Sequence, residues 1–117
     1  MQPLSGVLVL DFTTLLPGPL ATLLLAEAGA EVIKIERPGG EDMRHYEPRF
    51  DGESAMFALL NRGKRSLVLD LKGDSARDTM MPLLEKADVL VEQFRPDVMA
   101  RLGLDRKSTR LNSSHRT

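Results

Sequence analysis

The segment Val7–Phe12 constrains the fold more than any other part of the chain, because nearly all of its residues are apolar. Such a run is typical of a strand buried on both faces, as in parallel sheets. A Leu- and Ala-rich stretch over residues 20–28 follows two prolines suited to a helix start, and Gly29 is placed to end that helix. Glu31–Glu36 then alternates charged and apolar residues. Strand, helix and strand at this spacing predict a right-handed βαβ unit.

The rest of the chain continues to alternate strands and helices after a long polar segment. The patterns predict, in chain order, a loop over Arg37–Gly52, a short helix over Glu53–Leu60, a strand over Ser66–Leu71, a helix from Ser75 to Lys86, a strand over Asp88–Glu92 and a short helix over Pro96–Leu102. Pro82 inside the longer helix predicts a kink or a new start. The whole order predicts an α/β fold with a partial doubly wound, Rossmann-like parallel sheet.

Candidate ligand-binding residues follow the ends of the predicted strands, where open α/β sheets bind their ligands. Basic side chains suit phosphate groups, and apolar positions suit a flat ring or a long amide chain. The candidates are Leu15, Arg37, Leu69, Lys72, Gln93, Phe94 and Arg101. The alternative is a solvated rim whose charges only aid solubility.

A basic turn before the third strand is a second candidate for a phosphate contact. The turn Asn61–Arg65 contains Lys64, and Lys72 follows the strand at its other end. Positive charge on both flanks of a buried strand suits a phosphate-bearing ligand laid across the sheet edge.

Several common functional sites are poorly supported by the residues. The first strand is followed by no G-x-G-x-x-G, and the chain has no Walker A pattern, so the ordinary nucleotide fingerprints are missing. The chain has no cysteine, and its histidines are His45 and His115, which leaves little for a metal site or a Ser-His-Asp triad. Asp11 could be catalytic, but a hydrogen-bonded structural role is the better interpretation.

Charge and composition also bear on partners and location. A net charge of −1 argues against broad nucleic-acid binding. The longest apolar stretch, residues 15–28, is too short and too interrupted by Pro17, Pro19 and Glu27 to span a membrane. No basic N-terminal signal region is visible, and the absence of cysteine fits a reducing compartment. We therefore expect a cytoplasmic protein without nucleic-acid or membrane partners.

The last thirteen residues differ from the rest of the chain. Residues 105–117 are basic and have almost no apolar content, whereas residues 1–104 are mildly acidic. One interpretation is a disordered basic tail. The other is a non-native tail, because residues 105–115 resemble the in-frame translation of a sequencing adapter. We therefore expect one domain part over residues 1–104, with the native sequence differing beyond Leu104.

Several motifs follow one another in a fixed order over residues 4–104: Leu4–Phe12, Pro17–Pro19, Gly29–Asp42, Asn61–Ser66 and Ala87–Pro96. Together they resemble the class III CoA-transferases, the CaiB/BaiF family. The resemblance implies that the chain is the N-terminal part of the large domain of such an enzyme. Related alpha-methylacyl-CoA racemases share the fold, and the long segment between Arg37 and Asn61 favours the transferases over them.

The resemblance implies that coenzyme A or an acyl-CoA binds as a substrate, with no tightly bound cofactor. Leu15 matches a position that touches CoA, while Arg37, Lys72 and Arg101 match basic contacts to its phosphates. Leu69 matches a backbone position beside the adenine. Gln93 and Phe94 match the pair after the fourth strand, where many members have Asn before Phe.

The family resemblance also implies a reaction and an assembly. The enzymes transfer CoA from an acyl-CoA to a free carboxylic acid through an aspartyl anhydride and an enzyme-bound CoA thioester. The aspartate nucleophile lies further along the chain than residue 117, so we expect no catalytic residue here and no activity from this chain alone. The parent enzyme is expected to form an interlocked homodimer. A racemase fragment and an inactive CoA-binding half-domain remain the alternatives.

Overall fold

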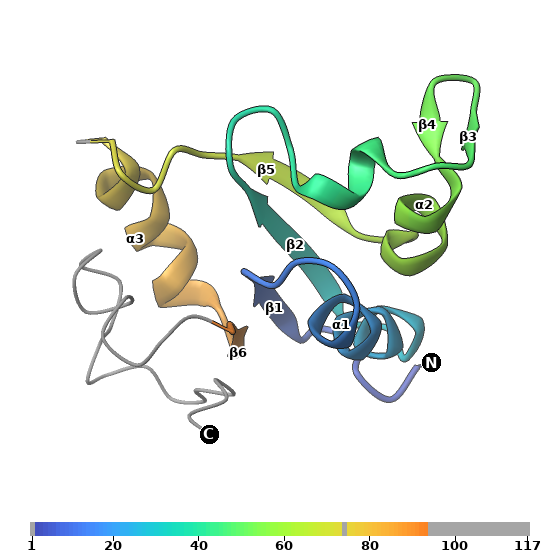
Figure 1. Ribbon diagram of the computed structural model, residues 1–117. Helices are drawn as coiled ribbons and strands as arrows, with labels where there is room; N and C mark the ends of the chain where they lie inside the picture. The colour runs from blue at the N-terminus through green and yellow to red at the C-terminus, as the bar shows by residue number, and fades with distance from the viewer. Residues whose placement is uncertain (1, 74, 94–117) are drawn as a thin grey trace.

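The computed structural model describes residues 2–73 and 75–93. Within them, the chain forms a four-stranded parallel sheet and a small antiparallel hairpin (Figure 1). The strands of the parallel sheet are β1 (Leu8–Asp11), β2 (Glu31–Glu36), β5 (Arg65–Val68) and β6 (Val89–Val91), and those of the hairpin are β3 (Arg49–Phe50) and β4 (Glu53–Ser54). The helices are α1 (Pro17–Glu27), the 3-10 helix η1 (Asp42–His45), α2 (Ala55–Asn61) and α3 (Ala76–Lys86).

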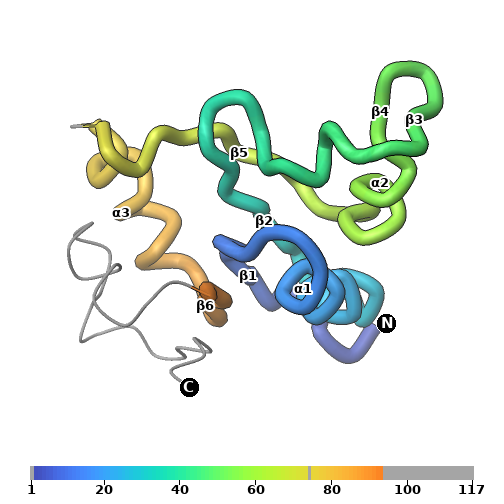
Figure 2. Tube along the Cα trace, in the orientation of Figure 1, coloured from blue at the N-terminus to red at the C-terminus, as the bar shows by residue number. Residues whose placement is uncertain are grey.

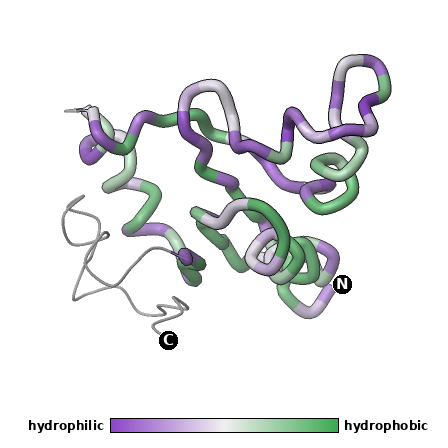
Figure 3. Tube along the Cα trace, viewed as in Figure 1, coloured by the Kyte–Doolittle hydropathy of each residue, from purple (hydrophilic) through white to green (hydrophobic). Residues whose placement is uncertain are grey.

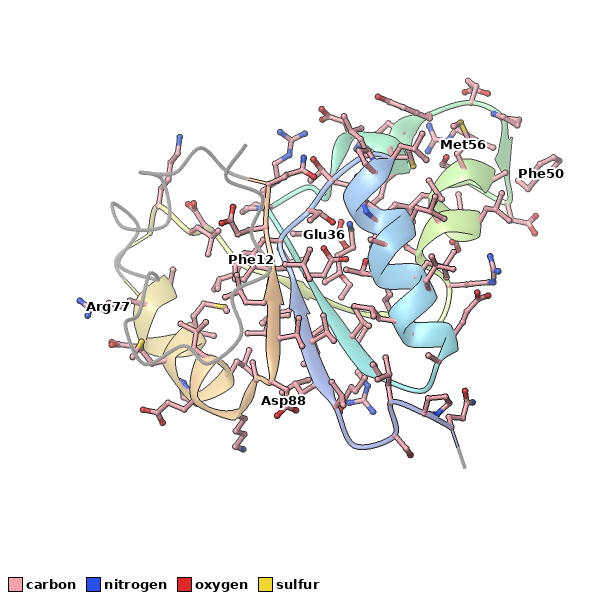
Figure 4. The ribbon with its side chains drawn as sticks, turned by 90° about the horizontal axis from the view of Figure 1, so that it is seen from below. Phe12, Glu36, Phe50, Met56, Arg77 and Asp88 are labelled. Carbon is pink, nitrogen blue, oxygen red and sulfur yellow. The ribbon has the colours of Figure 1, made fainter. Side chains whose placement is uncertain are left out.

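The strand order is β5-β2-β1-β6, which is the doubly wound arrangement predicted from the sequence. The chain first moves outward from β1 through β2 to β5, and it then crosses back so that β6 pairs with the free side of β1. Figure 4 shows α1 and α2 on one side of the sheet and α3 on the other. The point where the strand order reverses therefore lies between the ends of β1 and β6.

Alternation along the two central strands sends apolar side chains to both faces. Leu10 and Ile35 pack with Met80 and Leu84 of α3 on one face. Val9 and Val32 form a smaller cluster with α1 residues on the other face. On the α1 face of β2, however, Val32 is followed at period two by Lys34 and Glu36, both buried. This face is thus apolar near the amino ends of the strands and charged near their carboxyl ends.

Helix α1 begins at Pro17, three residues before the predicted start. Proline is accepted there because the N–H groups of the first helical turn have no acceptor within the helix, so the missing N–H of proline costs no hydrogen bond. Its end is a Schellman motif, in which the Ala30 N–H donates to the Leu25 carbonyl at 3.1 Å and the Gly29 N–H donates to the Ala26 carbonyl at 3.0 Å. Gly29 has φ +107°, which confirms its predicted role at the helix end. Figure 3 shows that α1 is hydrophobic over most of its length.

The segment between β2 and α2 is more ordered than its composition predicts. Instead of a loop over residues 37–52, it contains η1 and strand β3, and the predicted helix start at Glu53 is strand β4. Ser54 begins α2 by accepting a hydrogen bond from the Phe57 N–H at 3.3 Å. Elements of two to four residues are too short to show a period, so the sequence pattern could not reveal them.

Strand β5 differs from the predicted third strand in length and in burial. It ends at Val68 and not at Leu71, and three of its four residues are exposed. The reason is its place at the edge of the described sheet, where only β2 pairs with it. Helix α3 runs through Pro82 as one helix, so the predicted new start there is wrong.

Some predictions fall outside the described residues: the helix over residues 96–102, Phe94, Arg101 and the tail over residues 105–117. The path of the described chain can be followed in Figure 2. Among the residues that the structure describes, no helix is long and apolar enough to cross a membrane.

Candidate functional site

A cavity of about 460 Å³ opens at the carboxyl ends of three neighbouring strands. Every residue that lines it lies at the end of β1, β2 or β5 or in the segment that follows. The lining residues are Phe12, Thr14, Ile35, Glu36, Arg37, Pro38, Glu41, Asp42, Leu69, Asp70, Leu71 and Lys72. The volume lies within the range usual for small-ligand sites, about 300–1,000 Å³. Open α/β sheets bind their ligands at this edge.

Arg37, Leu69 and Lys72, three of the predicted site residues, line this one cavity. Arg37 is exposed, and its guanidinium donates to the Gly40 carbonyl at 3.1 Å and pairs with Asp42. The Leu69 N–H donates to the Glu36 carbonyl at 2.8 Å, which extends the β2–β5 pairing to the cavity floor. Lys72 is exposed at the rim. Arg37 and Lys72 therefore lie on the same cavity, and Arg101, the third basic residue predicted to contact the phosphates, lies outside the described residues.

The acidic residues in the lining do not all act as free negative charges. Glu36 accepts from Arg44 at 2.7 and 2.6 Å and also from Ser66 and the Glu41 N–H. Burial alone would raise the pKa of Glu36, but these hydrogen bonds outweigh it and lower the pKa to about 2. Figure 4 shows Glu36 near the middle of the molecule, in contrast to Phe50, which projects from the hairpin. Glu36 is therefore part of the cavity wall as an ionised carboxylate whose charge is balanced by Arg44.

The loop after β1 forms the neighbouring wall. The Thr14 N–H donates to Gln93 Oε1 at 3.3 Å, and Gln93 Nε2 donates to Thr14 Oγ1 at 3.2 Å. These two bonds join the ends of β1 and β6, where the strand order reverses. Leu15 follows with φ +67° in the left-handed region. Leu15 and Gln93 do not line the cavity themselves. Each lies beside a lining residue, because Leu15 follows Thr14 in the chain and Gln93 is hydrogen-bonded to Thr14.

A layer of buried charge lies beneath this loop. Lys34 Nζ pairs with Glu41 Oε1 at 2.6 Å, and both side chains are only 1% exposed. Lys34 also donates to the Thr13 carbonyl at 2.9 Å, and the Leu15 N–H donates to Glu41 Oε2 at 2.8 Å. These contacts tie the loop after β1 to strand β2 and to the turn that follows it.

Asp11 and Lys64 form a second part of the buried charge. Asp11 accepts from the Thr13 N–H at 2.8 Å, from the hydroxyls of Thr13 and Thr22, and lies 3.3 Å from Lys64 Nζ. Lys64 also donates to the Pro19 carbonyl and to Asn61 Oδ1. Burial lowers the pKa of Lys64 to about 8, although the nearby Asp11 opposes that shift. A structural role for Asp11 agrees with these contacts.

The predicted phosphate contact at the basic turn is wrong for Lys64. Its side chain is only 1% exposed, and its three partners lie within the protein. Arg65 lies 3.5 Å from Glu31, at the amino end of β2 and away from the cavity. A basic residue before a strand carries the same sequence signal whether it faces solvent or the interior, and the packing of α1 decided which.

Sequence reasoning missed Lys34, Glu41 and Arg44 as supports of the site. One signal was available for Lys34: it alternates with Ile33 and Ile35 in a central strand, which places a charge inside the fold. The described residues offer no group of three or more His, Cys, Asp or Glu side chains that could hold a metal ion. His45 is exposed, as expected from its polar surroundings.

Comparisons with known proteins agree on one family. The model of CoA-transferase family III matches residues 4–113. An acetyl-CoA:oxalate CoA-transferase from Acetobacter aceti is 48% identical over 104 residues, which cover 88% of this chain and 27% of that protein. A succinate–glutarate CoA-transferase from Agrobacterium fabrum is 44% identical over 117 residues, which cover 93% and 29%.

Solved structures give the same result. The crystal structure of a CaiB/BaiF family protein from Brucella suis matches with a TM-score of 0.84 at 35% identity, covering 92% of this chain and 30% of that one. A protein from Mycobacterium tuberculosis matches with a TM-score of 0.84 at 44% identity, covering 94% and 30%. The chain thus spans less than a third of the length of the relatives it matches.

Proposed function

The chain belongs to CoA-transferase family III, and on that basis we propose that it is the CoA-binding N-terminal part of an enzyme that transfers CoA from an acyl-CoA to a free carboxylic acid. The observation that carries the proposal is the cavity at the carboxyl ends of β1, β2 and β5, with Arg37 and Lys72 on its rim. Phe12, Ile35, Leu69 and Leu71 supply apolar surface for an adenine ring or the pantetheine arm. The two basic groups suit the phosphates. Coenzyme A and its thioesters enter as substrates, with no tightly bound cofactor.

The reaction needs a carboxylate that attacks the thioester carbonyl, so that a mixed anhydride forms while the C–S bond breaks and the CoA thiolate leaves. We assign this nucleophile to a part of the parent enzyme outside this chain. Two acids beside the cavity support that assignment, because Asp11 and Glu36 are buried and their oxygens already accept hydrogen bonds. The chain alone is then expected to bind CoA without turning it over. Turnover of acyl-CoA and free acid by the chain alone would place the nucleophile within it.

Binding of CoA, measured by isothermal titration calorimetry, tests the proposal. Removing both basic groups, as Arg37→Ala with Lys72→Ala, is expected to weaken binding roughly 30- to 100-fold, because each charge-assisted phosphate contact contributes about 1.5–3 kcal/mol before screening. Lys86→Ala is the matched control, since Lys86 is an exposed lysine at the end of α3 that does not line the cavity. Equal weakening by the control, or none by the double variant, would contradict the proposal.

Asp42 is expected to oppose phosphate binding, and Asp42→Asn should tighten the binding of CoA about 3- to 10-fold. Its carboxylate pairs with Arg37 on the exposed rim, so a phosphate must share or replace that partner. Asp78→Asn, in the first turn of α3, removes another exposed acid, which does not line the cavity, and should leave binding unchanged. Calorimetry at two salt concentrations checks the result, because the gain should shrink as salt screens the charges. Weaker binding in Asp42→Asn would show that Asp42 supports the ligand.

The homodimer and the cytoplasmic location remain predictions. One exposed surface is relevant to the first of them: Leu16, Leu20 and Leu24 form an exposed apolar stripe at helical spacing along the start and body of α1. The size of the parent enzyme in solution, measured by light scattering, tests the dimer.

A further inference from the structure

The loop after β1 holds a backbone conformation that its own sequence does not favour. Leu15 has φ +67°, in the left-handed region that non-glycine residues enter at a cost of about 1–2 kcal/mol. Leu15 is 37% exposed, so it is not held in place by a fully buried side chain. Strained residues of this kind persist only when the surrounding structure determines them. Some group outside the loop must therefore hold Leu15 in place.

Glu41 is placed to be that group. Its Oε2 accepts the hydrogen bond of the Leu15 N–H at 2.8 Å, across 26 residues of sequence. Its Oε1 lies 2.6 Å from Lys34 Nζ in a pair that is almost fully buried. A carboxylate held on one oxygen by a buried ammonium has its other oxygen fixed in direction. The N–H of Leu15 is thus bound to a rigid, charged acceptor, which makes a stronger hydrogen bond than a neutral one.

The same carboxylate joins the two walls of the cavity. Glu41 belongs to the turn that carries Arg37, and its own N–H donates to Glu36 Oε1 at 3.1 Å at the end of β2. Leu15 follows Thr14, which lines the neighbouring wall. Lys34 adds a second tie, because it donates to the Thr13 carbonyl at 2.9 Å. A shift of Glu41 would therefore change the distance between the loop after β1 and the turn after β2.

We propose that Glu41 is a positioning residue, which fixes the loop of Thr13–Leu16 against the turn after β2 so that the cavity is formed before its ligand arrives. The value of this positioning for CoA rests on the proposed function, whereas the positioning itself does not. Preorganisation raises affinity because less ordering remains to be done on binding. Glu41 is one of the lining residues, but its side chain is only 1% exposed, so it acts mainly through the loop.

The experiment measures amide hydrogen exchange by NMR in the 117-residue chain, together with CoA binding. In Glu41→Gln, the side-chain oxygen is expected to turn to Lys34 and the NH₂ group to face the Leu15 N–H, so that hydrogen bond is lost. We expect the exchange rate of the Leu15 amide to rise at least about 10-fold, and CoA binding to weaken by about 10-fold, the effect of losing roughly 1.4 kcal/mol. The Phe12 amide, bonded to the Val91 carbonyl at 2.9 Å, should keep its protection.

Two further variants keep the test decisive. Glu27→Gln removes an acid whose pair with Arg62 lies on the surface, and it should change neither measurement. If Glu41→Gln does not fold, Lys34→Met with Glu41→Leu replaces the buried pair by apolar groups of similar size, which proteins often tolerate. In that double variant the Leu15 amide should again lose protection while Phe12 keeps it.

A double-mutant cycle with Leu15→Gly separates a positioning role from a general structural one. If Glu41 acts through Leu15, its replacement should weaken CoA binding much less when position 15 is glycine. Unchanged exchange at Leu15, or equal loss of protection at Leu15 and Phe12, would overturn the proposal. Faster exchange of the Leu15 amide with unchanged CoA affinity would show that the positioning by Glu41 does not contribute to binding. If the unaltered chain binds no CoA while the exchange results hold, the proposed function fails and the positioning role stands.

Discussion

Replacing Asp11 with alanine is expected to lower the free energy of unfolding by about 3–5 kcal/mol. The side chain is fully buried, and it accepts hydrogen bonds from the Thr13 N–H, the Thr13 hydroxyl and the Thr22 hydroxyl. It also lies 3.3 Å from Lys64 Nζ, whose side chain is only 1% exposed. Alanine would leave the Thr13 N–H and the Thr13 hydroxyl unsatisfied and one buried ammonium without its counter-charge, and such groups cannot recover their partners from water. The Thr22 hydroxyl would keep an acceptor in the Pro19 carbonyl at 3.2 Å.

Urea denaturation followed by circular dichroism measures this effect. Asp78→Ala is the control, because Asp78 is an exposed acid in the first turn of α3, where its removal should cost no more than about 0.5–1 kcal/mol. Asp11→Asn should fall between the two, since the amide keeps one acceptor oxygen but loses the charge that faces Lys64. A loss below about 1 kcal/mol for Asp11→Ala would show that these contacts do not support the fold and would reopen a functional role for Asp11.

Gly18→Ala is expected to lower the free energy of unfolding by about 2–4 kcal/mol, because the new methyl group has no room. A Cβ at position 18 would lie 2.2 Å from Thr13 Cβ, 2.5 Å from Cγ2 and 2.6 Å from Oγ1. Thr13 is fully buried and bonded to Asp11, so it cannot turn away without breaking those bonds. Helix α1 would have to move away from the loop after β1, and CoA binding should weaken with it.

Gly63→Ala is the matched comparison for this prediction. Nothing lies within 4 Å of a Cβ at Gly63, so alanine there meets only the cost of its positive φ of +81°, about 1–2 kcal/mol. The thermal unfolding temperatures of the two variants compare the loss of stability from a steric clash, at position 18, with the loss from a positive φ, at position 63. Equal losses for Gly18→Ala and Gly63→Ala would mean that the close approach of α1 to Thr13 relaxes easily.

The order of the parallel strands and of the helices between them, and with it the class of fold, could be predicted from local patterns. The apolar run ending at Phe12, the prolines before α1 and Gly29 after it each act within a few residues, so their effect survives in the sequence. Local patterns also predicted that Arg37 and Lys72 follow the ends of strands, and parallel strands bring their carboxyl ends to one edge of the sheet. Motif order was also sufficient to recognise the family.

Only the tertiary structure decided which charges face the cavity and which face the interior. Lys64 and Lys72 flank the same strand, yet one is buried against Asp11 and the other lies exposed on the cavity rim. Lys34 and Glu41 are seven residues apart, and their pairing depends on how the turn after β2 folds back over the sheet. The free energy of a charge depends on the groups packed around it, and those groups come from distant parts of the chain. Local sequence therefore specified the parallel strands, their helices and the edge that carries the cavity, while long-range packing determined whether each charge there is buried or exposed.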